Sequence, residues 1–187
     1  KDIRDYGSNN AGLTNVLRVF GKGPAVATLM CDLAKGVLAV VICRLVVTNG
    51  FGVTFFHDDK FIGYLAGFFV MLGHIFPVFY GFHGGKGVLI AATTLIAIDP
   101  LTCVFSVAVF AIVLAATKYV SVGSICAAIA YPVFTPIVQL FIIKGDGVLA
   151  NTLMASAIGL LIIYMHRPNI KRLMNGTENK FGSKKKA

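Results

Sequence analysis

The sequence predicts an all-α fold, a polytopic integral membrane helical bundle with six transmembrane spans. Hydrophobic residues make up 57% of the 187-residue chain, charged residues make up only 13%, and the mean hydropathy is +0.81. A soluble domain carries about 25% charged residues, so this composition excludes an ordinary soluble protein. The few charges gather in short segments between apolar runs, as insertion in a bilayer requires.

The six apolar segments are separated by short polar or glycine-containing breaks. Most of them approach the roughly 20 residues that cross ~30 Å of hydrocarbon. The third segment is shorter and is followed by Pro100, and proline disfavours a helical conformation at the residue before it. We therefore expect a helix boundary at this point. The predicted spans are 25–48, 61–80, 88–98, 101–117, 121–142 and 147–165.

The distribution of charge supports counting 88–98 as a separate crossing. One set of loops and termini then holds thirteen Lys and Arg residues, and the other set holds only Lys60 and Lys144. This strong positive-inside bias predicts that the basic side faces the cytoplasm. A single span over 88–117 would instead place the basic N-terminal segment and the basic tail on opposite faces of the membrane.

We expect one membrane-embedded domain, residues 1–187. It consists of a cytoplasmic loop (1–24), a transmembrane bundle (25–165) and a cytoplasmic basic tail (166–187), whose last residues are expected near anionic headgroups. The net charge of +9 follows from this topology, so nucleic acid is not an expected partner. No metal site is expected, because the four cysteines lie inside apolar segments without C-x-x-C spacing. The oligomeric state stays open, and a monomer is compatible with the sequence.

The first of three polar clusters on the basic side is GSNNAGLTNVLR, residues 7–18. It combines small hydrogen-bonding side chains, glycines that permit tight turns, and a terminal cation. Such a run suits the binding of an anion, and a polar interfacial loop with a helix cap is the alternative. The candidate residues are Gly7, Ser8, Asn10, Gly12, Thr14, Asn15 and Arg18.

The second cluster is GHIFPVFYGFHGGKG, residues 73–87. Pro77 ends the preceding helix, the glycines expose backbone N–H groups, and the next helix begins with the positive end of its dipole here. A glycine loop, a lysine and a helix N-terminus together suit an anion, although the spacing is not that of a P-loop. The alternative is a hairpin with one interfacial lysine. The candidates are Gly84, Gly85, Lys86 and Gly87, with His83 beside them, whereas His74 is expected to be a packed histidine.

The third cluster is YMHRPNIKRLMNGTENKFG, residues 164–182. Its His166, Asn169 and Arg172 recur every three residues, which places them near one face if the segment is helical. Because proline is tolerated only in a first turn or at a kink, a short helix is expected to restart at Pro168. A positive-inside anchor is the alternative, but it leaves the histidine, the asparagine and the later glutamate unexplained.

Together the clusters describe a cytoplasmic mouth with several cations, glycine-loop donors and few carboxylates. This composition suits substrates with more than one phosphate group, approached from the cytoplasm while an apolar chain enters from the bilayer. From the residues alone, the chain is an anion-handling, lipid-facing membrane enzyme or transporter.

The three clusters resemble the signatures of the bacterial acyl-phosphate:glycerol-phosphate acyltransferases, the PlsY family, in order and in spacing. The resemblance covers nearly the whole chain, and His83 stands where the family usually has Lys or Arg. The family has seven spans, so the resemblance implies that a first span is missing from this sequence. The shared positions include Gly7, Ser8, Asn10, Gly12, Asn15, Arg18, Asp32, Lys35, Gly73, His74, Pro77, Gly84, Gly85, Lys86, Gly87, His166, Asn169, Arg172 and Glu178.

The resemblance implies transfer of an acyl group from acyl phosphate to the sn-1 hydroxyl of glycerol 3-phosphate. The products would be lysophosphatidic acid and phosphate, and no cofactor is implied. No histidine here is followed five residues later by the aspartate of H-x-x-x-x-D acyltransferases. Catalysis is therefore expected from positioning and charge stabilisation, with the donor's own phosphate taking the hydroxyl proton. The implied location is the bacterial inner membrane, with the site on the cytoplasmic face.

The resemblance also implies residue roles. Ser8, Arg18, Lys86, His166 and Asn169 are the expected catalytic residues, and Gly7, Asn10, Gly12, Asn15, Gly84, Gly85, Gly87 and Ser121 are expected to bind substrate. Within these sets, the first cluster and the glycine loop hold acyl phosphate, and the cations, His166, Asn169 and Ser121 hold glycerol phosphate. Asp32 and Lys35 are expected to form a structural pair, and Glu178 to order the tail.

The alternative from another functional class is a transporter of an organic phosphate anion. Such a protein would be built from half-helices whose dipoles point at the anion. It predicts internal repeats between the two halves and polar residues deep in several spans. The sequence shows no such repeat, and its polarity lies at one face, so the acyltransferase is preferred.

Overall fold

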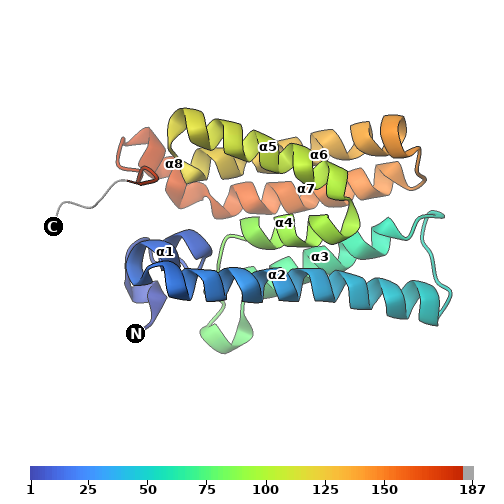
Figure 1. Cartoon of the computed structure of the whole chain (residues 1–187), viewed down its shortest axis with the longest axis horizontal. Helices are drawn as coiled ribbons and strands as arrows, with labels where there is room; N and C mark the ends of the chain where they lie inside the picture. Colours follow the sequence, from blue (N-terminus) through green and yellow to red (C-terminus); the bar gives the residue numbers. More distant parts are fainter. Residues whose placement is uncertain (183–187) are drawn as a thin grey trace. The chain divides into compact units, whose positions relative to one another are not determined.

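The computed structural model describes residues 1–182, and within these residues it is helical and contains no β-strand. Lys184, Lys185 and Lys186 of the predicted basic tail lie outside the described residues. The chain divides after Asp99 into two compact units, each described by itself below (Figure 1). The prediction of an all-helical integral membrane fold is confirmed.

Unit 1 contains four helices and three short helical segments. The helices are α1 (Leu13–Phe20), α2 (Lys22–Arg44), α3 (Lys60–Ile75) and α4 (Val88–Ile98), and the short segments are η1 (Ile3–Asp5), η2 (Leu45–Gly50) and η3 (Val78–Tyr80). The helices α2, α3 and α4 pack against one another, and α1 packs against α2. The segment η2 continues α2 as a π-helix.

Unit 2 contains α5 (Pro100–Thr117), α6 (Val120–Ile137), α7 (Val148–Met165) and α8 (Arg167–Met174), with η4 (Val138–Ile143) continuing α6 as a π-helix. The helix α6 packs against both α5 and α7. At one end of the unit the N–H of Phe181 donates to the carbonyl of Lys118 at 2.7 Å, so the tail lies against the α5–α6 connection. The last helix begins one residue before the predicted restart, and its proline lies in the first turn.

Five helical segments of the described chain are long and apolar enough to cross a membrane, and α4 is a shorter sixth. The break between α4 and α5 is present as predicted. Asp99 leaves the helical conformation, with φ −148° and ψ 83°, and Pro100 opens the next helix. The prediction of two helices in place of one long span is confirmed.

The helix α4 is eleven residues long, which corresponds to about 16 Å, roughly half of the hydrocarbon thickness. It is largely buried against α2 and α3. At its C-terminal end, Arg44 donates to the carbonyl of Ala97 at 3.1 Å and also pairs with Asp59. A cation at the negative end of a helix dipole is stabilising, and this role of Arg44 was not predicted from the sequence.

Glycines on α2 and α3 allow α4 to approach closely. A Cβ added to Gly36 would lie 2.1 Å from the Oγ1 of Thr93, and a Cβ added to Gly67 would lie 3.1 Å from the Cβ of Thr94. Both threonine hydroxyls donate to carbonyls within α4, so they are satisfied inside the bundle. Small residues at such contacts are typical of membrane helices, whose association depends on close packing.

We expect Gly36→Ala to destabilise the folded protein by about 1–3 kcal/mol, because the added methyl group overlaps α4. The measurement is the thermal unfolding midpoint of the purified protein in detergent. Gly23→Ala on the same helix is the matched control, since a Cβ there meets nothing within 4 Å. Equal midpoints for the two variants would contradict the close contact between α2 and α4.

Candidate active site

The first cluster is a compact loop organised by the side chain of Asn15, which is only 3% exposed. Its Oδ1 accepts the backbone N–H of Ser8 at 2.9 Å. Its Nδ2 donates to the carbonyls of Tyr6 and Asn10, at 2.9 and 3.0 Å. A Cβ at Gly7, whose φ is +66°, would lie 2.3 Å from that Oδ1. Asn15 is predicted to bind the donor substrate, and in the structure its amide holds the loop in shape.

Asn10 connects this loop to the glycine loop. Its Oδ1 accepts the N–H of Gly12 at 2.9 Å, where α1 begins, and its Nδ2 donates to the carbonyl of Gly84 at 3.5 Å. Arg18 is exposed in the last turn of α1. The first two clusters, which the charge pattern predicts on one side of the membrane, are thus in contact within unit 1.

The glycine loop is attached to the C-terminal end of α3 by two backbone hydrogen bonds. The N–H of Gly84 donates to the carbonyl of Ile75 at 3.1 Å, and the N–H of Gly85 donates to that of His74 at 3.2 Å. Side chains do not fit at either glycine. A Cβ at Gly84 would lie 2.0 Å from the carbonyl oxygen of His74, and a Cβ at Gly85 would lie 2.0 Å from its Nε2.

The glycine loop continues through Lys86 and Gly87 into α4. Gly87 has a φ of +80° and is the N-terminal cap of α4, where the positive end of the helix dipole lies. Lys86 is half-buried between its two glycine neighbours. A cation next to the backbone N–H groups of a helix start is the arrangement that the sequence predicts for an anion.

A polar network on α2 and α3 orients His74. The Nζ of Lys35 lies 2.6 Å from the Oδ1 of Asp32 and 3.0 Å from the Nδ1 of His74. Because an ammonium group only donates, this Nδ1 accepts, and the ring proton of a neutral imidazole is on Nε2. The Nε2 edge lies against Gly85. Asp32 and Lys35 therefore orient the ring on which the glycine loop rests.

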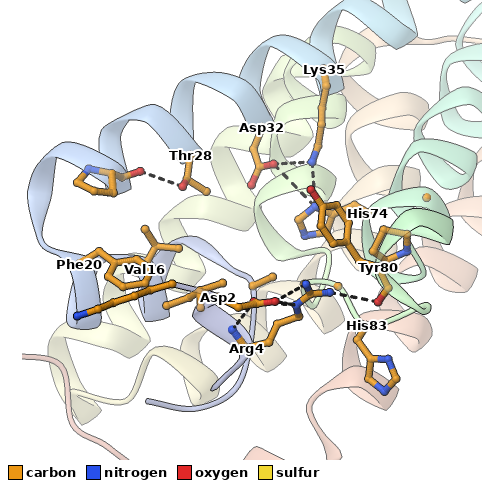
Figure 2. Close-up of a pocket in the computed structure, with 18 residues that line it drawn as sticks. Asp2, Arg4, Val16, Phe20, Thr28, Asp32, Lys35, His74, Tyr80 and His83 are labelled. Carbon is orange, nitrogen blue, oxygen red and sulfur yellow. Dashed lines mark hydrogen bonds and ion pairs between the residues drawn. The ribbon is translucent and has the colours of Figure 1, made fainter. Parts of the chain in front are cut away.

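A pocket of about 680 Å³ lies beside the glycine loop in unit 1 (Figure 2). It combines charged groups, glycine backbone and an apolar wall, which together suit an amphiphilic anion. Of the predicted site residues, Gly84, Gly85, Asp32 and Lys35 line it. The further lining residues include His74, Arg4, Thr28, Val16, Phe20 and Pro24.

Arg4 is a pocket residue that the sequence did not identify. Its side chain pairs with Asp2, donates to the carbonyl of Tyr80 at 3.2 Å and lies over the Tyr80 ring, 4.7 Å from the centroid (Figure 2). It thereby connects the N-terminal segment with the second cluster. The sequence signal was the basic residue inside the polar run KDIRDY, whose partner lies 76 positions away and cannot be read from local spacing.

In unit 2, Glu178 is the centre of a hydrogen-bond network. Its Oε1 accepts from the hydroxyl of Ser121 at 3.0 Å and from the Nδ2 of Asn169 at 2.7 Å. Its Oε2 accepts from the Nε of Arg172 at 2.6 Å. Ser121 and Asn169, which are predicted to bind glycerol phosphate, each donate one hydrogen bond to this carboxylate, so the tail is held over them.

His166 lies at the junction of α7 and α8 and is buried. Its Nδ1 donates to the carbonyl of Ile162 at 2.8 Å, which assigns the proton to Nδ1 and leaves Nε2 as the other ring nitrogen. The structure therefore gathers the predicted residues in two groups. The first and second clusters meet in unit 1, and the third cluster meets Ser121 in unit 2.

Comparison with known proteins agrees with the motif register. The family model described as glycerol-3-phosphate acyltransferase matches residues 1–176. A curated glycerol-3-phosphate acyltransferase of Clostridioides difficile (strain 630) is 43% identical over 184 residues, which cover 98% of this chain and 84% of that protein. The chain belongs to the glycerol-3-phosphate acyltransferase family. The PlsY-type resemblance of the three clusters is confirmed.

Further relatives extend this result to the fold. A family member from Paraburkholderia phymatum is 41% identical over 186 residues, covering 100% of this chain and 82% of that protein. The crystal structure of PlsY, an integral membrane glycerol 3-phosphate acyltransferase, in its glycerol 3-phosphate form is 37% identical with a TM-score of 0.78, over 97% of this chain and 83% of that chain. The lysophosphatidic acid form has a TM-score of 0.75 at 37% identity, over 94% and 82%. The chain is thus a multi-pass membrane protein of this family.

We expect Gly85→Ala to abolish most of the enzymatic activity, because the methyl group would overlap the His74 ring and displace the loop. The loss should be about a hundredfold in kcat/KM, as for a catalytic group displaced by about 1 Å. Gly23→Ala is the control, since a Cβ there meets nothing within 4 Å and Gly23 does not line the pocket. Comparable activity in the two variants would contradict the packing of the loop on His74.

A second expectation concerns Glu178. Burial raises its pKa, but hydrogen bonds from Asn169, Arg172 and Ser121 outweigh burial and hold the pKa below the ordinary value of 4.5. A lowered pKa in the folded state means that the ionised group adds stability above pH 4.5, and this contribution is lost as the pH falls further. Unfolding midpoints should therefore separate wild type from Glu178→Gln at neutral pH and converge in acid. A constant difference between the two proteins would contradict this assignment.

Proposed function

We propose that this chain transfers a fatty acyl group from acyl phosphate to the sn-1 hydroxyl of glycerol 3-phosphate. The products are lysophosphatidic acid and inorganic phosphate, and the process belongs to phospholipid synthesis. Family membership supports the acceptor and the reaction, and the solved relatives are described in glycerol 3-phosphate and lysophosphatidic acid forms. The register of the three motifs over nearly the whole chain supports acyl phosphate as the donor.

The main support for the donor site is the contact between the first cluster and the glycine loop. Asn10 and Gly84 make this contact beside the pocket. The loop presents its backbone groups to the phosphate of the donor. Lys35 and Arg4 add positive charge to the pocket lining, although each is paired with an aspartate. The apolar wall of Val16 and Phe20 suits the start of an acyl chain.

The reaction needs little chemistry from the protein. The acceptor hydroxyl oxygen attacks the acyl carbonyl carbon, a C–O bond forms, and the bond from that carbon to the phosphate oxygen breaks. The hydroxyl proton passes to the leaving phosphate. The protein contributes by aligning the two substrates and by stabilising the negative charge that develops on the carbonyl oxygen. Ser8 and the glycine loop are the proposed donors to that charge.

The acceptor is assigned to Arg18, Lys86, His166 and Asn169, with Ser121 as a further donor. The motif register supports this set. In unit 2, the Nδ1 of His166 donates to the carbonyl of Ile162, which orients the ring. Glu178 orders Asn169 and Ser121 by accepting one hydrogen bond from each.

The membrane orientation is proposed on the same basis. The chain is a multi-pass membrane protein. Most of the Lys and Arg residues between its spans lie in the loops and termini that contain the three clusters. The positive-inside rule therefore supports a site that opens to the cytoplasm, and family membership supports the bacterial inner membrane. The proposed organisation is a single acyltransferase domain.

The test supplies the purified full-length protein in vesicles with acyl phosphate and labelled glycerol 3-phosphate. Formation of labelled lysophosphatidic acid together with an equal amount of phosphate is the expected result. No product would refute the acyltransferase, and product from an acyl-CoA thioester but not from acyl phosphate would refute the donor. Accumulation of unmodified glycerol 3-phosphate inside the vesicles would favour the transporter instead.

We expect Lys86→Ala to lower kcat/KM by about 10²–10³ and to raise the KM for glycerol 3-phosphate, since it removes a charge that faces a phosphate group. Lys22→Ala is the control, because Lys22 is an exposed lysine at the start of α2 outside the proposed site. An unchanged KM for glycerol 3-phosphate in Lys86→Ala would contradict the acceptor assignment. Unfolding midpoints confirm that both variants fold.

A further inference from the structure

The turn between α3 and the glycine loop exposes a group of large apolar side chains. We call residues 77–83 the aromatic turn. In this turn Phe79 is 96% exposed, Val78 is 69% exposed, and Tyr80 and Phe82 are 61% and 60% exposed. Exposed apolar patches of this kind mark interaction surfaces, and the proposed reaction assigns no role to Val78, Phe79 or Phe82.

The backbone of the aromatic turn is hydrogen-bonded within itself. The N–H groups of Tyr80 and Phe82 donate to the carbonyl of Pro77 at 3.1 and 3.0 Å. The N–H groups of Gly81 and His83 donate to carbonyls inside the turn at 3.3 and 3.2 Å. Backbone donors that are satisfied internally lower the cost of leaving water, which a segment that enters the apolar edge of a bilayer requires.

Phe82 adopts a conformation that a bulky side chain rarely takes. Its φ is +62°, in the left-handed region, which costs an ordinary residue about 1–2 kcal/mol. Glycine or asparagine would occupy this position at lower cost. This conformation directs an exposed ring away from the packed helices, and it is compatible with a binding role for the ring.

The aromatic turn continues the lipid-facing surface of α3. The apolar candidate span runs from Lys60 through Tyr80, so it includes the first half of the turn. Arg4 lies over the Tyr80 ring, His83 is the last residue of the turn, and both line the pocket (Figure 2). Aromatic rings beside basic side chains are the composition of the membrane–water interface.

We propose that the aromatic turn inserts into the boundary between headgroups and acyl chains and holds the glycine loop at the depth of that boundary. The occupant of the exposed surface is the lipid bilayer itself. The N–H of Gly84 bonds to the carbonyl of Ile75, so the ends of the turn are joined and it behaves as a compact loop. Its depth in the bilayer therefore sets the depth of the glycines that follow it.

The chain contains no tryptophan, so a single Phe79→Trp variant gives one fluorescent reporter in the aromatic turn. The probe is a set of vesicles whose lipids carry bromine either near the ester linkage or near the chain end. We expect strong quenching by the shallow bromines, weaker quenching by the deep ones, and little quenching by aqueous acrylamide.

Two further single-tryptophan variants calibrate this result. Phe69→Trp, at a 62% exposed position inside α3, should respond most to deep bromines. Asn175→Trp, at an exposed polar position after α8, should respond to acrylamide. If Phe79→Trp behaves like Asn175→Trp, the turn lies in water and the proposal is wrong. If neither quencher reaches it, another protein surface covers the turn, and the proposal is equally wrong.

A kinetic test rests on the proposed function. Phe79→Ser should raise the KM for acyl phosphate dissolved in vesicles by roughly threefold to tenfold, because the glycine loop is no longer held at the lipid boundary. The KM for glycerol 3-phosphate should stay unchanged, and Phe79→Leu should restore the donor KM. An unchanged donor KM in Phe79→Ser would refute the coupling of turn and loop. Fluorescence quenching needs no turnover, so its outcome is independent of whether the acyltransferase assignment holds.

Discussion

Two backbone hydrogen bonds, from Gly84 to Ile75 and from Gly85 to His74, join the glycine loop to the C-terminal end of α3. They turn the chain back at the end of α3, so that α4 begins there and runs antiparallel to α3. They also place the carbonyl and ring of His74 where only glycine fits opposite them. The glycine loop, the end of α3 on which it rests and the helix α4 that follows it are therefore structurally coupled.

Charged groups within the bundle are held in pairs or networks. Lys35 bridges Asp32 and His74 near the middle of α2, and Arg44 bridges Asp59 and the end of α4 at the C-terminal end of α2. An unpaired charge is expensive inside a bilayer, so each of these contacts offsets a large desolvation cost. The Asp32–Lys35 pair also orients His74 beside the pocket.

The two units use different means to order their polar clusters. In unit 1, the neutral amides of Asn10 and Asn15 and the glycine backbone shape the loops. In unit 2, a carboxylate at Glu178 gathers the hydroxyl, amide and guanidinium donors around it. A tail that depends on an ionised carboxylate is sensitive to acid, whereas loops held by amides are not.

Hydropathy and charge along the chain determined the helices, because membrane spans are set by local composition and length. The 88–98 helix, the break at Asp99 and the restart near Pro168 follow from length and proline chemistry alone, and motif spacing determined the family. The tertiary structure decided which candidates support the site and which line the pocket. The amide of Asn15 orders the first cluster, and Arg4 and His74 line the pocket through contacts between distant segments. Local sequence patterns specify backbone conformation. Hydrogen-bond partners that are 39 to 76 residues apart, such as Lys35 with His74 and Arg4 with Tyr80, come together only when the helices pack.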